Sequence, residues 1–378
     1  MKPEFLHELE TPCVVIDYRR LVDNIKLMRD IAIKNKVALR PHIKTHKCLE
    51  IAKMQIKEGA IGITASKTDE AIVFIQRGIK SITVAYPIIQ ERKLERLVKS
   101  ATENNVSLRI VADSIEEIRN ISGVCKNYSF QLPVFIKIDV GLHRCGVTED
   151  DPVLIDLVKF VEDDRNMSFA GLFSHAGHAY AAKNAEEIRK IACEECDIML
   201  RLRQKIQDIG HDILEVSVGA TPTALVSTAY SGISEIRPGN YVFFDMTPVR
   251  QGLIGQENIA LSVLTTVISK NNNYCIIDSG SKSLSSDLGA HGILCTSGYG
   301  QAYKIEDYET MSNSMSVAKL SEEHGFIKHN CIDLKIGDKV RVFPNHSCPV
   351  ANLSEYFYIV DKDKLLDKWC VDARGCVR

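Results

Sequence analysis

A cluster of basic residues follows the first strand-like run of the chain and could carry amine chemistry. The segment RPHIKTHK (40–47) contains one arginine, two histidines and two lysines, and a helical pattern begins just after it. If the strand extends to Lys44, alternation of side chains places Arg40, His42 and Lys44 on one face. A lysine in a protein interior is costly unless it is paired, deprotonated or covalently bonded. Lys44 is therefore a candidate nucleophile. The alternative is that Lys44 and Lys47 are solvated residues at a helix start.

A second candidate site lies in the segment PNHSCPV (344–350). His346 and Cys348 are two residues apart, so their side chains share a face if the segment is extended. An imidazole and a thiolate together suit zinc best among the divalent metals. Two protein ligands leave coordination positions open, as catalytic metal sites require. The alternative is a histidine and a cysteine buried in a β core.

Glycine and hydroxyl residues follow two later strand-like runs, in GATPT (219–223) and RPGN (237–240). Threonine hydroxyls and backbone N–H groups at a turn or a helix start bind anions such as phosphate. Thr221 and Thr223 are therefore candidates for a phosphate site, to which the turn at 237–240 could add N–H groups. An ordinary helix N-cap explains the two threonines as well.

Alternating helical and strand-like patterns occupy the first two-thirds of the chain and must position these segments. Eight apolar, β-branched runs are predicted to be strands, at about 37–44, 60–66, 81–89, 106–113, 132–141, 167–177, 213–221 and 234–245. Helical patterns separate most of them, for example at 90–104 and 185–210. This α/β pattern predicts a (β/α)8 barrel of the TIM type. Because barrel enzymes place their active sites at the carboxyl ends of the strands, the reactive segments are expected to meet there.

The pattern changes after residue 250. Strand-like runs at 260–280 and 334–350 are separated by Asn and Gly turns, and long helical patterns disappear. We therefore expect a barrel over residues 18–250 and a mainly β domain over residues 251–378. The short run at 13–17 precedes the first barrel helix and is expected to join the β domain, together with the rest of residues 1–17.

Composition argues against several classes of function. The 47 Lys and Arg residues nearly balance 49 Asp and Glu residues, which gives no electrostatic basis for binding nucleic acid or a membrane. The sequence has no apolar run of about 18 residues, and its first residues lack the apolar core of a signal peptide. The expected compartment is the cytoplasm, where the 12 cysteines would be free thiols. Cys193 and Cys196 are predicted to be neighbours on a helix and not a redox pair.

Together, these segments resemble the D-threonine aldolase / D-serine dehydratase family, which comprises pyridoxal-phosphate (PLP) enzymes of the alanine-racemase fold type. The resemblance rests on TPCVVID, RPHIKTHK, KIDVGLHRCGV, SHAGHAY, GATPT, EIRPGNYVFFD, IDSGSKSLSSD, PNHSCPVANL and WCVDARGCVR, which occur in the family's order. It implies a PLP-binding barrel followed by a β domain with a divalent metal, either zinc or manganese. It also implies a small D-amino acid as substrate and, as in related enzymes, a homodimer.

The resemblance also implies roles for individual residues. Lys44 matches the lysine that binds PLP covalently, whereas Lys47 is expected in the first helical turn, facing outward. The implied cofactor-binding residues are Lys44, Arg144, His175, Thr221, Arg237, Gly239 and Asn240. Arg237 would face the pyridine nitrogen with support from His175, and Arg144 would approach the phenolic oxygen. His346 and Cys348 match the metal pair, and Lys44, His178 and Tyr180 are the implied catalytic groups.

Two reactions of D-3-hydroxy amino acids are compatible with these residues. Removal of the α-proton by Lys44, with loss of the β-hydroxyl, gives dehydration. Removal of the hydroxyl proton by His178, Tyr180 or a metal-bound water gives retro-aldol cleavage. The His-x-Cys pair favours dehydration of D-serine or D-threo-3-hydroxyaspartate over cleavage of D-threonine or 3-hydroxy-D-aspartate, because threonine-cleaving members tend to carry His-x-Asp. An amino-acid racemase is less expected because racemisation needs no metal, and residues 250–378 argue against a non-catalytic PLP-binding protein. Cys376 departs from the family, where a polar residue is expected.

Overall fold

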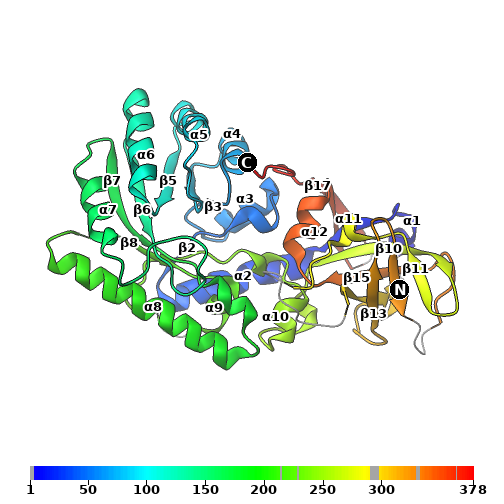
Figure 1. Ribbon diagram of the computed structural model, residues 1–378. Coiled ribbons are helices and arrows are strands. Elements are labelled where there is room, and N and C mark those ends of the chain that lie inside the picture. Colours follow the sequence, from blue (N-terminus) through cyan, green and yellow to red (C-terminus); the bar gives the residue numbers. More distant parts are fainter. Residues whose placement is uncertain (1–3, 213–214, 228–229, 290–297, 329–332, 363) are drawn as a thin grey trace.

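Two β structures make up the computed structural model, which describes residues 4–212, 215–227, 230–289, 298–328, 333–362 and 364–378. One is a sheet of eight strands and the other a sheet of nine. The two lie side by side, and the long helix α2 (Tyr18–Asn35) runs from the second toward the far side of the first (Figure 1). The described residues include no helix that is both long and apolar enough to cross a membrane.

The predicted barrel is confirmed, with each strand in its expected place but shorter than expected. The strands are β2 (Ala38–Leu39), β3 (Ile63–Ala65), β4 (Ser81–Val84), β5 (Ser107–Ala112), β6 (Leu132–Lys137), β7 (Met167–Phe173), β8 (Glu215–Val218) and β9 (Glu235–Ile236). Their order is β2-β9-β8-β7-β6-β5-β4-β3. A bridge between His42 and Thr64, with a 2.7 Å hydrogen bond from the Thr64 N–H to the Pro41 carbonyl, joins β2 to β3 and closes the ring.

Helices cover the outside of the barrel. They are α2, α3 (Leu49–Lys57), α4 (Thr68–Gln76), α5 (Glu91–Glu103), α6 (Ile115–Tyr128), α7 (Val153–Glu162), α8 (Ala185–Asp208) and α9 (Thr221–Val226). The predicted helices at 90–104 and 185–210 correspond to α5 and α8. Asp17 caps α2 by accepting a 3.1 Å hydrogen bond from the Arg20 N–H. Cys193 and Cys196 lie within α8 as free thiols, as the helical pattern predicts.

The second sheet combines an N-terminal strand with C-terminal strands. Its members are β1 (Cys13–Asp17), β10 (Leu261–Lys270), β11 (Tyr274–Ile277), β12 (Gly300–Lys304), β13 (Met315–Leu320), β14 (Gly325–Lys328), β15 (Lys339–Pro344), β16 (Tyr356–Asp361) and β17 (Lys364–Cys370). β1 pairs with β10 antiparallel and with β16 parallel. The described helices here are short: α1 (Glu4–Glu8), α10 (Met246–Arg250), α11 (Ser281–Leu284) and α12 (Ser347–Leu353).

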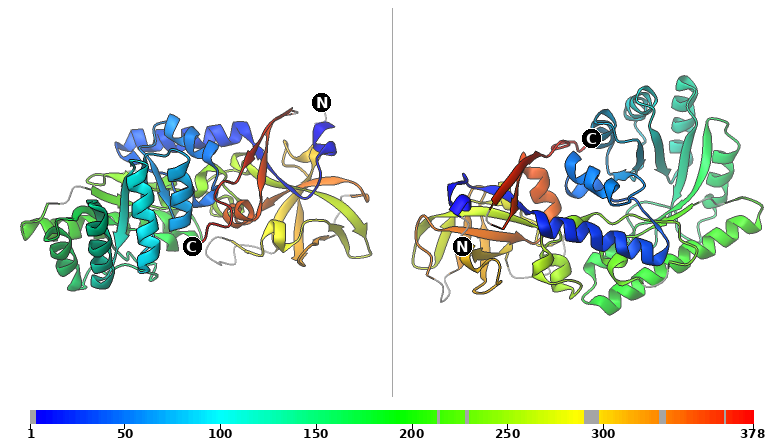
Figure 2. Two further views of the ribbon diagram at one scale, coloured as in Figure 1. Left: turned by 90° about the horizontal axis from the view of Figure 1, so that it is seen from above. Right: turned by 180° about the vertical axis from the view of Figure 1, so that it is seen from behind.

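The chain ends against the barrel and not against the sheet that it has just left. Figure 2 shows the C-terminus beside α3 and α4, whereas the N-terminus lies on the second sheet. The Asp372 carboxylate accepts a 2.7 Å hydrogen bond from the Leu49 N–H at the start of α3. The Thr68 hydroxyl, at the start of α4, donates to the Arg378 carbonyl at 3.0 Å. This C-terminal segment therefore connects the two β structures beside the carboxyl ends of the barrel strands.

Charged side chains occupy part of the barrel interior, where bulky apolar residues are usual. The Glu235 carboxylate lies 2.6 Å from the Arg40 guanidinium and 2.7 Å from that of Arg109. Arg109 also pairs with Glu215 at 2.6 Å. The three arginines Arg109, Arg40 and Arg237 overcome the effect of burial and hold the pKa of Glu235 below its usual range. The side chain of Glu235 is 1% exposed and that of Glu215 is 35% exposed, so the network is buried at Glu235 and reaches solvent at Glu215.

Candidate active site

The carboxyl ends of the barrel strands and the helix α12 enclose a cavity of about 420 Å³, a size that suits a small ligand. Figure 1 shows α12 facing the barrel beside α3. The cavity is lined by His42, Lys44, Thr45, Lys47, His175, Tyr180, Ala220, Thr221, Arg237, Gly239, Asn240, Asp287, His346, Cys348, Pro349 and Asn352. Residues from both β structures therefore meet in one site.

Lys44 lines this cavity from a 3-10 helix, η1 (Ile43–Thr45), and not from a strand. The expectation that strand alternation aligns Arg40 with Lys44 is therefore wrong. β2 ends at Leu39, but the chain stays extended to His42, whose N–H donates to the Pro238 carbonyl at 3.0 Å, and it turns into η1 before it reaches Lys44. Burial, with the charges of Arg144 and Lys137, holds the pKa of Lys44 below its usual range, although the Cys348 thiolate opposes this. A lowered pKa provides the free amine that attacks a carbonyl carbon.

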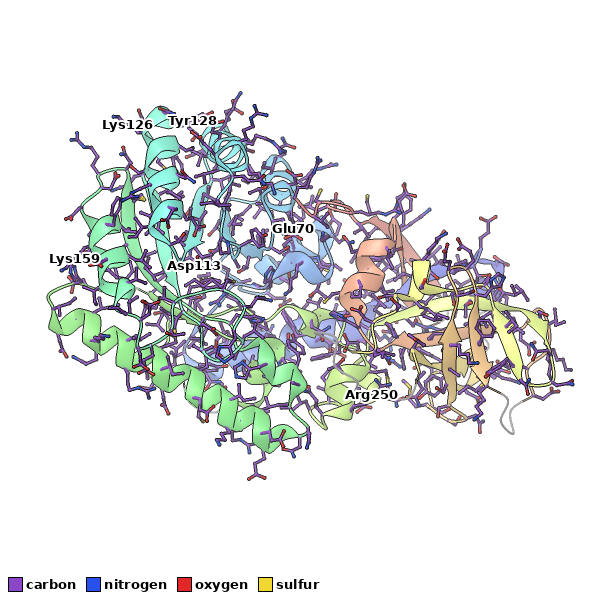
Figure 3. All side chains as sticks on the ribbon, in the orientation of Figure 1. Glu70, Asp113, Lys126, Tyr128, Lys159 and Arg250 are labelled. Carbon is purple, nitrogen blue, oxygen red and sulfur yellow. The ribbon has the colours of Figure 1, made fainter. Side chains whose placement is uncertain are left out.

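Lys47 is also buried, so the expectation that it faces outward is wrong. α3 begins only at Leu49, and Lys47 has a left-handed backbone with φ of 49°. Its ammonium donates to the Cys376 carbonyl at 3.0 Å and lies 3.8 Å from Glu70, which Figure 3 labels on the side of the barrel toward α12. Because this contact uses a backbone carbonyl, it does not depend on the side chain of Cys376.

Arg237 lines the cavity and places a positive charge there. Its guanidinium donates to the Ser217 hydroxyl and to the Ser174 carbonyl, and its central carbon lies 3.4 Å from the centroid of the Phe173 ring. Burial lowers the pKa of Arg237 to about 10, so the residue remains a cation at neutral pH. Ser217 donates in turn to Glu235 at 2.6 Å, which links Arg237 to the charged network of the barrel.

The predicted anion-binding residues surround one end of the cavity. Thr221 accepts a 3.2 Å hydrogen bond from the Gly239 N–H, and its side chain is also hydrogen-bonded to Tyr180. A Cβ at Gly239 would lie 2.9 Å from the His42 carbonyl, so only glycine fits there. The side-chain amide of Asn240 donates to Asp245 at 2.7 Å and to the Ser347 hydroxyl at 2.9 Å, so the group of Asn240 that could bind an anion is its backbone N–H. Lys44, Arg237 and Thr221 thus fit a group that carries both an aldehyde and a phosphate.

His346 and Cys348 meet at the start of α12 and not on an extended strand. β15 ends at Pro344, and His346 is the N-cap residue of α12, with Cys348 in its first turn. Burial alone would lower the pKa of His346, but the Cys348 thiolate and the Asp287 carboxylate raise it to about 10. His346 in turn lowers the pKa of Cys348 against the effect of burial. The thiolate and imidazole fit a borderline-soft divalent metal, and the described residues contain no third clustered ligand.

Three predicted site residues, Arg144, His178 and Thr223, lie outside the cavity lining. Arg144 is exposed in the loop after β6, which Asp113, labelled in Figure 3, fastens by accepting a 2.8 Å hydrogen bond from the Gly146 N–H. Arg144 is still close enough for its charge to lower the pKa of Lys44. The His178 ring lies 3.4 Å from the position that a Cβ on Gly141 would occupy. The Thr223 hydroxyl accepts a 2.9 Å hydrogen bond from the Ala220 N–H and donates to the Ala220 carbonyl at 3.0 Å, so it acts as a helix cap. The other predicted site residues line the cavity, including Tyr180, His175 and the metal pair.

Sequence reasoning did not assign several of the lining residues. They are His42, Thr45, Lys47, Asp287 and Asn352. All of them lie inside the segments RPHIKTHK, IDSGSKSLSSD and PNHSCPVANL, which were already singled out, so position within these segments was the available signal. Thr45 contacts the metal pair, because its hydroxyl lies 3.3 Å from the Cys348 sulfur.

Two family models match the chain. The model described as alanine racemase, N-terminal domain, matches residues 16–247, and the one described as a putative serine dehydratase domain matches residues 260–360. The chain is 31% identical to the D-serine dehydratase of Dictyostelium discoideum over 386 residues, which cover 95% of each protein. It is 28% identical to a D-threonine aldolase of Arthrobacter over 379 residues, which cover 99% of this chain and 95% of the aldolase.

A solved structure has the same fold. The D-threo-3-hydroxyaspartate dehydratase from Delftia sp. HT23 superposes with a TM-score of 0.88 and 29% identity, covering 97% of this chain and 98% of the dehydratase. A cysteine-to-alanine mutant of D-threo-3-hydroxyaspartate dehydratase is described as being in the metal-free form. This description indicates that the dehydratase also has a form that holds a metal.

Proposed function

Because this chain belongs to the D-threonine aldolase / D-serine dehydratase family, we propose that it is a PLP- and divalent-metal-dependent lyase that dehydrates a D-3-hydroxy amino acid. The observation that carries this proposal is that Lys44, with its lowered pKa, shares one cavity with the His346–Cys348 pair. A carbonyl-reactive amine and a metal-binding pair are then both within reach of one small substrate. D-Serine and D-threo-3-hydroxyaspartate are the favoured substrates, as they are for the related dehydratases.

The chain's own groups divide the reaction between them. When bound, PLP supplies an electron sink for charge that develops at the α-carbon, and the metal supplies a Lewis acid at the β-oxygen. Lys44 would hold the cofactor through its amine, and the same amine, when free, would serve as the base that removes the α-proton of the substrate. His346 and Cys348 hold the metal beside the β-oxygen. Arg237 would supply a cation beside the ring of the cofactor, and Thr221 and Gly239 would hold its phosphate. The released enamine hydrolyses to a 2-oxo acid and ammonia.

The two side chains proposed as bases for the competing aldol cleavage are poorly suited to that role. Burial, followed by the charge of Cys348, raises the pKa of Tyr180 above its usual range, so its hydroxyl holds its proton at neutral pH. His178 lies outside the cavity lining. Retro-aldol cleavage requires a base that removes the β-hydroxyl proton, whereas dehydration requires none at that oxygen. The lack of a suitable base in Tyr180 and His178, together with the His-x-Cys pair, favours dehydration. Cleavage of D-threonine or 3-hydroxy-D-aspartate, for which a water could serve as the base, is the second candidate because aldolase relatives align along 99% and 97% of the chain.

We expect 2-oxobutanoate and ammonia when D-threonine is incubated with the protein, PLP and either Zn²⁺ or Mn²⁺, with the products identified by NMR. D-Serine and D-threo-3-hydroxyaspartate would then be compared as substrates. Glycine with acetaldehyde would instead identify an aldolase and contradict the role given to Cys348. L-allo-Threonine as the single product would identify a racemase and contradict the need for a metal.

Removing either member of the metal pair should abolish metal binding and slow the dehydration. We expect His346→Ala and Cys348→Ala to lower kcat at least about 10²-fold, because a Lewis acid contributes several kcal/mol to charge stabilisation. Metal content would be measured by elemental analysis, and cofactor content by the visible absorbance of the protein. Cys193→Ala, which removes an exposed thiol of α8, is the matched control. Full activity in a His346→Ala/Cys348→Ala protein would rule out the metal role.

A further inference from the structure

Asp287 approaches His346 from a segment that sequence reasoning left without a role. Its carboxylate oxygen lies 2.9 Å from the His346 Nδ1 atom. The carboxylate is 59 positions from the histidine along the chain, so the contact is a product of the fold. The side chain of His346 is 19% exposed and that of Asp287 is 43% exposed, which places the pair at the rim of the cavity. Asp287 and His346 both line this cavity.

The hydrogen bond determines which nitrogen of His346 is available to a metal. In the neutral imidazole that binds a metal, Nδ1–H is donated to the Asp287 carboxylate, and Nε2, once it has lost its proton, has the lone pair that the metal requires. Histidine ligands commonly use their second nitrogen in this way, which fixes the tautomer and the orientation of the ring. The backbone on each side of His346 is already held, since the Asn345 carbonyl accepts a 2.8 Å hydrogen bond from the Thr247 hydroxyl and the Ser347 N–H donates to Asp245 at 2.9 Å. The conformational freedom that remains to His346 is rotation of its imidazole ring.

The segment that carries Asp287 is held in place by its backbone contacts and by a buried side chain. α11 begins after Gly280, where a Cβ would clash with the Glu322 carbonyl, so the two backbones are in close contact. Leu284, at the end of α11, is buried. Ser285 follows with φ of 62° and ψ of 157°, a conformation that is rare for residues other than glycine. The Asp287 N–H donates to the Ser285 hydroxyl at 3.2 Å. The turn thus sends the carboxylate toward His346.

We infer that Asp287 is a positioning residue that orients His346 for the divalent metal, acting as a hydrogen-bond acceptor and not as a metal ligand. This inference rests on the proposed function, because it assumes that His346 and Cys348 hold the metal. It predicts that the acceptor oxygen of Asp287, more than its charge, supports metal binding. The variant Asp287→Asn retains such an oxygen in its side-chain amide, whereas Asp287→Ala removes it.

The test compares Zn²⁺ affinity of the PLP-loaded wild type, Asp287→Asn and Asp287→Ala by competition with a chromophoric chelator. We expect Asp287→Ala to weaken Zn²⁺ binding about 10- to 100-fold, the range for loss of a residue that orients a ligand. Asp287→Asn should stay much closer to wild type. The visible spectrum of the Co²⁺-loaded proteins should keep its thiolate band in both variants, since Cys348 is intact. Asp333→Ala, which removes an exposed carboxylate paired with Lys270, is the control.

Each other result overturns the inference in a recognisable way. Wild-type Zn²⁺ affinity in Asp287→Ala would show that His346 needs no orientation by Asp287. Equal loss in Asp287→Asn and Asp287→Ala would show that the carboxylate acts through its charge or as a ligand. An unchanged Zn²⁺ affinity in His346→Ala would instead remove the proposed metal pair, and with it the metal-dependent function. Circular dichroism of each variant shows whether a loss of affinity comes from unfolding.

Discussion

Lys44→Ala is expected to abolish the covalent attachment of PLP and to lower the rate of dehydration at least about 10³-fold. The substitution removes the amine that binds the cofactor and the base for the α-proton, and a positioned base alone contributes about 10²- to 10⁴-fold. Covalent attachment is measured by mass spectrometry after borohydride reduction, which should place the cofactor mass on the peptide that contains residue 44 in the wild type. The same peptide of the variant should carry no added mass.

The matched control is Lys53→Ala, because Lys53 is an exposed lysine of α3 whose side chain pairs with Glu50 at the surface. It should keep its cofactor and its rate. Attachment of PLP to Lys47 in the wild type would contradict the assignment, since Lys47 also lines the cavity. The lowered pKa of Lys44 and the contact of Lys47 with the Cys376 carbonyl both argue for Lys44 as the reactive amine.

Glu235→Gln should reduce the free energy of unfolding by about 3–5 kcal/mol, the cost of removing one member of a buried ion pair. Because glutamine has nearly the same shape as glutamate, the decrease in the free energy of unfolding measures the contribution of the negative charge of Glu235. Arg40 would keep its 2.8 Å hydrogen bond to the Ser81 hydroxyl but lose its carboxylate, and Arg109 would keep Glu215 and its 2.9 Å hydrogen bond to the Thr83 hydroxyl. Urea-induced unfolding of the cofactor-free protein, followed by circular dichroism, measures the change.

Glu50→Gln serves as the control for this measurement. Glu50 pairs with Lys53 at 2.8 Å, but the two side chains are 48% and 53% exposed, and exposed pairs contribute about 0–1 kcal/mol. A loss in Glu235→Gln no larger than in Glu50→Gln would mean that the barrel network is not an important source of stability. Because Ser217 connects Glu235 to Arg237, the variant should also shift the visible absorbance of bound PLP.

The apolar pattern of the sequence predicted the barrel strands but extended most of them beyond the residue at which the strand ends in the structure. The expected strand at 37–44 is a two-residue strand followed by η1, and the expected extended segment at 344–350 becomes the start of α12. Apolar alternation continues past the last ladder hydrogen bond, since the side chains that enclose a cavity are also partly buried. Where a strand ends depends on its neighbours in the sheet, and these come from distant parts of the chain.

The sequence by itself determined the barrel and singled out the segments that line the cavity, because these depend on local periodicity and on motifs; the roles given to Lys44, His346 and Cys348 stay predictions. Only the tertiary structure decided what these residues contact. Lys47 meets a carbonyl 329 positions away, and His346 meets a carboxylate 59 positions away. Such contacts depend on how the barrel and the second sheet dock, since a hydrogen bond between distant segments forms only when both backbones are held in place. Local residue preferences do not encode that arrangement.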